Sequence, residues 1–251
     1  MEHTRSDNGR HPRPGSHGHD RLATTVALAS ACLLLLAIPA FWPDYLGKFG
    51  DAHGHTHAHA LLGTAWLALL VVQPLLIRAR RRSAHRLLGG IGLVVGLAFI
   101  VSGVLLTHHN LGRMSDEAFA RFGHFAWLPL SMTAIFAAAL ALAIAWRRVP
   151  GAHGRFMAVT ALPLLDPLFA RLLHHYAPPL PAWYLYQTPA FALATAVLFV
   201  LWARWPDRLP GRRAFAVFAV LAVLVLLGYF ATPGCAAWLD LVDAFRALPL
   251  T

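Results

Sequence analysis

Residues 57–82 read HAHALLGTAWLALLVVQPLLIRARRR, and this stretch shows the pattern that decides the fold. It starts with histidines, continues with an apolar block and ends in arginines. A helix needs about 20 apolar residues to cross the hydrocarbon core of a bilayer, and the block is long enough. Gln73 and Pro74 near its end predict a local kink with a satisfied amide. We therefore expect a transmembrane helix over residues 57–78.

Blocks of the same kind recur along the chain. They cover residues 22–42, 57–78, 87–108, 123–146, 156–176, 184–204 and 213–232. The composition agrees, because 58% of the residues are hydrophobic and only 13% are charged. Soluble proteins carry about 25% charged residues. The sequence thus predicts an all-α membrane protein with seven transmembrane helices and the lipid bilayer as its surroundings.

The basic residues predict the orientation, since cytoplasmic loops are enriched in Lys and Arg. Most of the 21 Lys and Arg residues lie in the N-terminal tail and in the loops 78–86, 147–155 and 204–213. These segments alternate with spans, which places the N-terminus in the cytoplasm and the C-terminus outside. The formal charge of +10 follows this topology. It does not form a basic face interleaved with aromatics, so we expect no nucleic-acid partner.

Three regions are expected. Residues 1–20 form a disordered cytoplasmic tail rich in His and Arg, and residues 21–235 form the seven-helix domain. Residues 236–251 form a short helix that lies on the outer, periplasmic interface or caps the bundle. Within the domain, residues 57–109 and 123–175 resemble two tandem helical hairpins, each with histidines at both ends and arginines at its turn. Such hairpins predict a central four-helix bundle.

Histidines recur at one expected depth. At the helical rise of 1.5 Å per residue, the histidines of four helices lie about 28–34 Å from the arginines at the opposite helix ends. The candidate metal or haem ligands are His59, His108, His109, His124, His174 and His175. A further metal set comprises His53, His55 and His57, in which His53/His57 and His55/His59 are helical neighbours. His85 and His153 stand beside arginines and are expected to cap loops or contact lipid headgroups.

The chemistry of these side chains narrows the cofactor. Neutral imidazole binds Zn, Cu, Fe and Ni, and it is the axial ligand of haem b. Carboxylates are few here and no thiolate pair exists, which disfavours Ca, Mg and di-iron sites. The leading hypothesis is a haem b or a transition-metal ion near the periplasmic face, passing electrons to or from a quinone or a periplasmic redox partner. The alternatives are a non-haem Zn, Cu or Ni protein that binds or transports the metal, and a scaffold with interfacial histidines and no cofactor.

A polar pocket is expected below the histidines. Asp166, Arg171 and Gln187 fall within or beside apolar spans, where a charge is costly and usually faces a cavity or a partner. A structural Asp–Arg pair, or an arginine that reaches toward the interface, is the alternative. No nucleophile–base pair or phosphate loop is present, so the sequence leaves open whether the protein is an enzyme.

The quoted motifs resemble a known group. The runs HAHALLGTAWLALLVVQPLLI, RRRSAHRLLGGIG and HGRFMAVTALPLLDPLFARLL resemble a family of bacterial predicted inner-membrane proteins without an assigned activity, over about residues 41–175. This resemblance implies a multi-pass protein of the bacterial inner membrane. The paired histidines are also weakly similar to those of transmembrane b-type cytochromes, although here they stand at helix ends.

Overall fold

The structure is a computed structural model that describes residues 16–180, 183–205 and 211–251. These residues are helical or connecting, and none of them is in a β-strand. The α-helices are α1 Ser16–Phe41, α2 Gly54–Arg78, α3 Arg82–Gly112, α4 Asp116–Phe122, α5 Trp127–Ala145, α6 Pro150–Val159, α7 Leu165–Tyr176, α8 Thr188–Ala203, α9 Arg212–Ala231 and α10 Ala236–Arg246. Short 3-10 helices link them: η1 Leu46–Asp51, η2 Gly123–Ala126, η3 Leu162–Leu164, η4 Trp183–Tyr186 and η5 Thr232–Gly234. The all-helical fold class is confirmed.

Six helices in the described part are long and apolar enough to cross a membrane. They are Leu22–Phe41, Gly54–Arg78, Arg82–Gly112, Asp116–Ala145, Pro150–Tyr176 and Arg212–Gly234. The predicted span at 184–204 coincides with α8, which has only 16 residues. At 1.5 Å per residue, α8 measures about 24 Å, less than the hydrocarbon thickness of about 30 Å. The structure therefore supports a multi-pass membrane protein, and seven spans remain a prediction.

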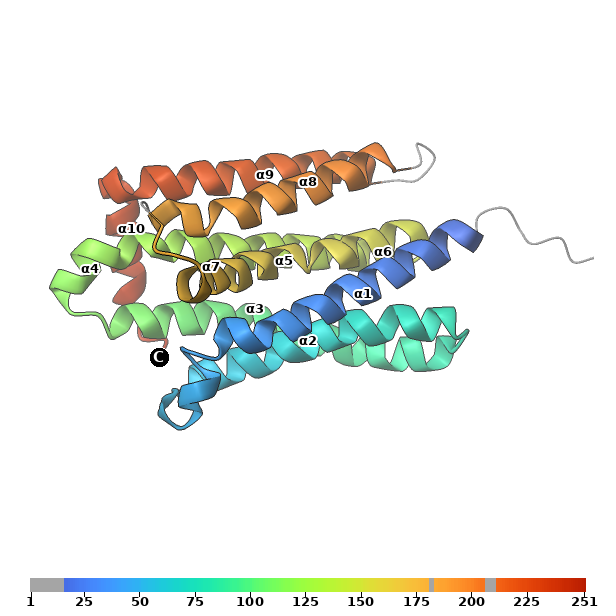
Figure 1. The fold of residues 1–251 in the computed structure, drawn as a ribbon, viewed down its shortest axis with the longest axis horizontal. Coiled ribbons are helices and arrows are strands. Elements are labelled where there is room, and N and C mark those ends of the chain that lie inside the picture. Colours follow the sequence, from blue (N-terminus) through green and yellow to red (C-terminus); the bar gives the residue numbers. More distant parts are fainter. Residues whose placement is uncertain (1–15, 181–182, 206–210) are drawn as a thin grey trace, which may run out of the picture.

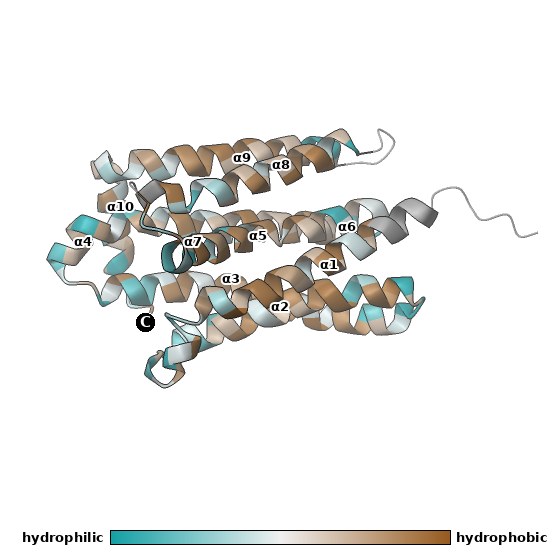
Figure 2. Cartoon of the chain, in the orientation of Figure 1, coloured by the Kyte–Doolittle hydropathy of each residue, from teal (hydrophilic) through white to brown (hydrophobic). Residues whose placement is uncertain are grey.

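The two ends of the bundle differ in chemistry. The α2–α3 and α5–α6 connections, the end of α8, the start of α9 and the start of α1 lie at one end, which we call the arginine end (Figure 1). The helices α4 and α10 and the start of α2 lie at the other, the histidine end. Colouring by hydropathy shows apolar residues along the middle of the helices and hydrophilic ones at both ends (Figure 2). Charges thus sit where a bilayer's polar interfaces would lie.

The helix over Pro150–Tyr176 is interrupted. The α6 helix ends at Val159, η3 covers Leu162–Leu164 around Pro163, and α7 begins at Leu165. Proline lacks an N–H and clashes with the preceding turn, so it breaks the backbone ladder. Irregular backbone at membrane depth is tolerated where protein covers it or where it lines a cavity. Thr160 at this break is fully buried.

The two predicted hairpins differ for this reason. The first consists of α2 and the continuous 31-residue α3. The second consists of α5 and the broken pair α6 and α7. The α3 helix packs against α5, and the fully buried Trp66 of α2 packs edge-on against Phe136 of α5 at 5.1 Å between ring centres. These contacts join the hairpins through one apolar core, to which α1 and α8 also contribute.

The last helix folds back onto the histidine end. In α10, Val242 is buried, and Trp238 packs edge-on against Trp127. The indole N–H of Trp238 donates to the backbone oxygen of His124 at 3.2 Å. Leu241 is exposed on the other side of the helix. The α10 helix lies within the expected segment 236–251 and packs over the end of the bundle, and its place on a periplasmic interface stays a prediction. Of the tail predicted over residues 1–20, residues 1–15 lie outside the described residues. Residues 16–20 belong to α1, which starts at Ser16.

Candidate functional site

The predicted haem ligands lie at the histidine end in separate surroundings. His59 on α2 faces α3, where its Nδ1 lies 3.0 Å from Ser102 Oγ and its ring stacks on Phe99 at 4.6 Å between centres. Ser102 Oγ donates to the Phe99 carbonyl at 2.9 Å. The serine therefore has only acceptor capacity left for His59, whose Nδ1 carries the proton. His59 is fastened to α3, and its Nε2 keeps the lone pair.

His108 on α3 holds the residues that follow α10. Its Nε2 donates to the carbonyl oxygen of Leu248 at 2.8 Å, and its Nδ1 lies 2.6 Å from Thr251 Oγ1. The ring also packs edge-on against Phe245. Both nitrogens are thus used, which leaves the ring unsuited to binding a metal in this conformation.

The remaining predicted haem ligands contact different side chains. The ring of His124, in η2, packs against Phe125 at 4.2 Å between centres. On α7, His174 packs edge-on against Tyr186 at 5.4 Å. Its neighbour His175 reaches Asp44, just after α1, with Nε2 at 2.8 Å from Oδ2. These contacts place the predicted ligands in separate surroundings, and the four-helix haem arrangement stays a prediction.

Three other imidazoles come together, and we call His53, His55 and His109 the imidazole cluster. His53 is the N-cap residue of α2, His55 lies in its first turn, and His109 lies in the last turn of α3. The ring centre of His109 is 5.1 Å from that of His53 and 4.7 Å from that of His55. His109 Nε2 is buried and has no hydrogen-bond partner in the described structure.

These ring distances suit a shared ion. Imidazoles that bind one tetrahedral ion through nitrogens at about 2.0–2.1 Å hold their ring centres roughly 5 Å apart. Across the described ranges, however, no three His, Cys, Asp or Glu side chains form a group that could hold a metal in this conformation. His53 is exposed and His55 is half-buried, so both rings have room to turn.

The helical neighbours proposed from the sequence contact different elements. His57 turns toward η1, where its Nδ1 lies 3.0 Å from the hydroxyl of Tyr45 and its ring packs on Phe49. His55 and His59 both face α3, but at different turns of that helix. Sequence reasoning placed His109 with the haem ligands and did not pair it with His55. The antiparallel α2–α3 hairpin could have indicated this pairing, because it brings the start of α2 next to the end of α3.

The predicted polar residues lie in or near α7, but only Asp166 lines the cavity there. Asp166, in the first turn of α7, has a buried Oδ1 without a hydrogen-bond partner among the described residues. Gln187, just before α8, has a buried Oε1 that also lacks a hydrogen-bond partner among the described residues. Arg171 Nη1 donates to the carbonyl of Pro167 at 3.1 Å, and its guanidinium lies over the ring of Phe41. Its ion-pair partner is Asp44, at 3.9 Å.

Asp44 joins this region to the loop after α1. Partial burial raises the pKa of Asp44, but the hydrogen bond to His175 and the charges of His175, Arg171 and Lys48 outweigh that effect. The pKa of Asp44 therefore lies below its ordinary value, and the carboxylate is charged over the physiological range. This clasp, formed by Asp44, Arg171 and His175, ties the end of α1 to the end of α7.

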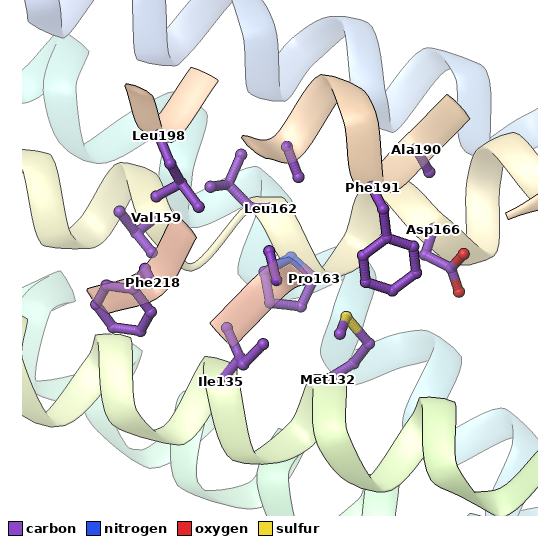
Figure 3. A pocket seen from close by; sticks show the side chains of 12 residues that line it. Met132, Ile135, Val159, Leu162, Pro163, Asp166, Ala190, Phe191, Leu198 and Phe218 are labelled. Atoms are coloured by element: carbon purple, nitrogen blue, oxygen red, sulfur yellow. The ribbon is translucent and has the colours of Figure 1, made fainter. Parts of the chain in front are cut away.

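A small cavity lies next to Asp166, with about 20 Å³ of free space. Its walls come from α5, α8, α9 and the broken stretch between α6 and α7. Asp166 and Phe191 stand together at one end of it, and Leu198 and Phe218 stand at the other (Figure 3). A water needs about 10–15 Å³ measured in this way, so the cavity has the volume of about one water, and its lining other than Asp166 is apolar.

Comparison with known proteins gives no relative. No protein-family model, curated protein or solved structure matches this chain significantly.

Proposed function

We propose that this chain is a multi-pass membrane protein that binds one transition-metal ion at its histidine end, through His53, His55 and His109. The observation that carries the proposal is the gathering of three rings with His109 at the centre, 5.1 and 4.7 Å away from the other two. The two helices that supply them are joined as an antiparallel hairpin, so the rings stay close without any other element.

The donor set indicates which metals suit the site. Imidazole nitrogens without thiolates favour Zn²⁺, Cu²⁺ or Ni²⁺, and three of them leave a coordination position for water. Binding requires the rings of His53 and His55 to turn their nitrogens toward the free Nε2 of His109. The exposure of His53 keeps that rearrangement inexpensive. Metal binding in this proposal is a surface property of the bundle, separate from transport.

The arrangement of charges supports an orientation for this site. The α2–α3 and α5–α6 connections, the end of α8 and the start of α9, which carry the described arginines of these loops, lie at the end opposite the imidazole cluster (Figure 1). Under the positive-inside rule, the arginine end faces the cytoplasm. The cluster then faces the periplasm of a bacterial inner membrane, in contact with metals outside the cell.

The haem hypothesis has less support from the geometry. His108 has both nitrogens in hydrogen bonds, His59 is bonded to Ser102 of α3, and His175 is bonded to Asp44 after α1. A haem held by these residues would require several helix ends to rearrange together. The metal-ion proposal requires two surface rings to rotate.

Copper titration of the purified protein tests the proposal. The parent for this experiment carries alanine at the N-terminal histidines, because that segment could bind metal by itself; the replaced residues are His3, His11, His17 and His19. We expect one equivalent of Cu²⁺ by calorimetry, with electron paramagnetic resonance hyperfine structure from imidazole nitrogens. His109→Ala should weaken binding at least about tenfold, since even outer-shell changes cost that much.

His174→Ala is the matched control, because it removes a histidine at the same end of the bundle without touching the cluster. It should bind copper like the parent. Equal copper affinity in His109→Ala and the parent would refute the proposal, provided that both variants show the same thermal unfolding. The optical spectrum of the same sample tests haem, which predicts a reducible Soret band.

A further inference from the structure

Five arginines gather where α2 turns into α3, and we call this group the arginine turn. The connection is short, because α2 ends at Arg78 and α3 begins at Arg82. Hydrophilic residues mark this end of the two helices (Figure 2). The guanidinium groups are therefore confined to one small surface. The members of the group, all of them exposed, are Arg78, Arg80, Arg81, Arg82 and Arg86.

The charges of the arginine turn are not neutralised by the protein. Among the side chains that the structure describes, no Asp or Glu forms an ion pair with any of the five arginines. Two arginines at the histidine end differ in this respect, since Arg171 pairs with Asp44 and Arg246 pairs with Asp116. Exposed guanidinium groups without a carboxylate favour an anion from outside, and phosphate matches their fork of N–H donors.

The backbone indicates that Arg80 is there for its side chain. The N–H of Arg81 donates to the carbonyl of Leu76 at 2.9 Å, and the N–H of Arg80 donates to that of Ile77 at 3.0 Å. This pair of bonds is the Schellman motif, in which the left-handed residue after the helix is usually glycine. Here that residue is Arg80, with φ of 58°, the one non-glycine residue with a positive φ in the described ranges. A Cβ disfavours this conformation, and strain of this kind is found at functional sites.

Apolar side chains flank the arginine turn on the side of the bundle. Leu75 and Ile77 precede it on α2, and Leu87 and Ile91 follow it on α3. These four side chains are between 44% and 71% exposed. In a membrane they lie in the hydrocarbon, which places the arginines at the level of the headgroups. A molecule with a negative head and apolar chains fits both parts of this surface.

We propose that the arginine turn is a binding site for the phosphate headgroup of an anionic phospholipid. The guanidinium groups donate to the phosphate oxygens, and the acyl chains lie along the exposed leucines and isoleucines of α2 and α3. A zwitterionic lipid fits less well, because its own cation meets the same uncompensated positive charge. Each arginine near an anionic lipid surface contributes about fivefold in affinity. The site uses other residues than the metal site and lies at the opposite end of the bundle.

Native mass spectrometry of the full chain in detergent tests this site. The probe is dioleoyl phosphatidylglycerol, and dioleoyl phosphatidylcholine is the control lipid, since it has the same chains and a neutral headgroup. We expect the anionic lipid to bind at least about tenfold more tightly, because several arginines contribute. Equal binding of the two lipids would overturn the proposal.

Two triple variants distinguish a local site from the overall charge of the arginine end. Both remove three exposed arginines from the same end of the bundle, and only the first changes the arginine turn. The first should reduce the affinity for phosphatidylglycerol at least about tenfold, and the second should change it less than about twofold. Equal weakening by both would refute a site at this turn. The variants are Arg80→Gln/Arg81→Gln/Arg82→Gln and Arg147→Gln/Arg148→Gln/Arg213→Gln.

Arg80→Gly separates the side chain from the backbone. Glycine suits the left-handed position, so the variant should unfold at a higher temperature than the parent. It should also bind phosphatidylglycerol about fivefold more weakly, because one guanidinium is lost. Unchanged affinity for phosphatidylglycerol would refute the role of Arg80. This stable variant and the comparison of lipids on the parent keep the proposal open to refutation even if a triple variant fails to fold.

Competition by inorganic phosphate distinguishes a lipid from a free anion. At constant ionic strength and equal concentration, inorganic phosphate should leave bound phosphatidylglycerol in place, because it has no chains to pack on α2 and α3. Displacement of the lipid under these conditions would overturn the lipid assignment. Copper binding by the imidazole cluster should be the same in all these variants, so the two proposals succeed or fail separately.

Discussion

Trp66 of α2 donates its indole N–H to Thr160 Oγ1 at 3.1 Å, at the point where α6 ends. The hydroxyl of Thr160 in turn donates to the Met157 carbonyl at 2.6 Å. Trp66 and Thr160 are both almost fully buried. The interrupted backbone of the Pro150–Tyr176 helix is therefore braced by a side chain from a distant part of the sequence.

The Trp66–Thr160 bond predicts a coupled pair of variants. Thr160→Val leaves the indole N–H buried and unpaired, which should lower the free energy of unfolding by about 1–3 kcal/mol. Trp66→Phe removes the donor but also leaves a void, and should cost a similar amount or more. Because both changes break one bond, the double variant should cost less than the sum. Thermal unfolding in detergent measures this, and strict additivity would contradict the coupling.

The Asp44 clasp predicts a dependence of stability on pH. The pKa of Asp44 in the folded protein lies below its unfolded value of 3.8. Its ionised form therefore stabilises the fold above pH 3.8, and this contribution is lost as the pH falls through the lower folded value. Asp44→Asn should remove that part of the acid dependence, with a small effect because Asp44 is half-exposed. Melting curves between pH 3 and 6 that coincide in shape for parent and variant would contradict it.

His108 predicts a local loss of order. His108→Phe keeps an aromatic ring against Phe245 but removes the bonds to Leu248 and Thr251. We expect faster amide exchange at residues 247–251, with little change in α2 and α5. Hydrogen–deuterium exchange with mass spectrometry resolves these segments. Unchanged exchange at 247–251 would show that packing, rather than the two hydrogen bonds, holds them.

Gly96 predicts a packing defect in α3. A Cβ at Gly96 would lie 2.8 Å from Leu140 Cδ2 and 2.9 Å from Trp66 Cζ3. Both neighbours are buried, so Gly96→Ala should lower the free energy of unfolding by about 1–3 kcal/mol through overpacking. Gly90→Ala is the matched control on the same helix, because its Cβ would meet nothing within 4 Å. Equal melting temperatures for the two variants would contradict the close approach of α3 to Trp66.

Hydropathy predicted the helical passes well because a bilayer imposes one strong requirement, a long apolar run. The expected span at 57–78 corresponds to α2 over Gly54–Arg78. The expected span at 156–176 missed the interruption at η3, although Pro163 was a signal for it. Apolarity is insensitive to such a break, which depends on neighbours that cover the freed backbone. The short length of α8 could not be predicted either, because hydropathy changes gradually at the ends of an apolar block.

The histidines show where prediction from depth stops. The rise per residue placed them at one end, and the structure has them there. Depth does not give direction, however, because each residue turns the side chain by about 100° around the helix axis. His57 and His59 are two residues apart and so contact different elements, Tyr45 of the loop and Ser102 of α3. The contact between His55 and His109 depends on how α2 and α3 pack together. Residue spacing along one helix does not predict that packing.

The interrupted helix over Pro150–Tyr176 has a consequence for how the protein is made. At about 1.5 Å per residue, neither α6 nor α7 could cross the hydrocarbon alone, and the pair carries Asp166 and Arg171. The partners of Thr160 and Arg171, which are Trp66 for the first and Phe41 and Asp44 for the second, are synthesised earlier. The Pro150–Tyr176 segment is therefore synthesised after the residues that contact Thr160 and Arg171. We expect insertion of this segment to depend on those earlier helices.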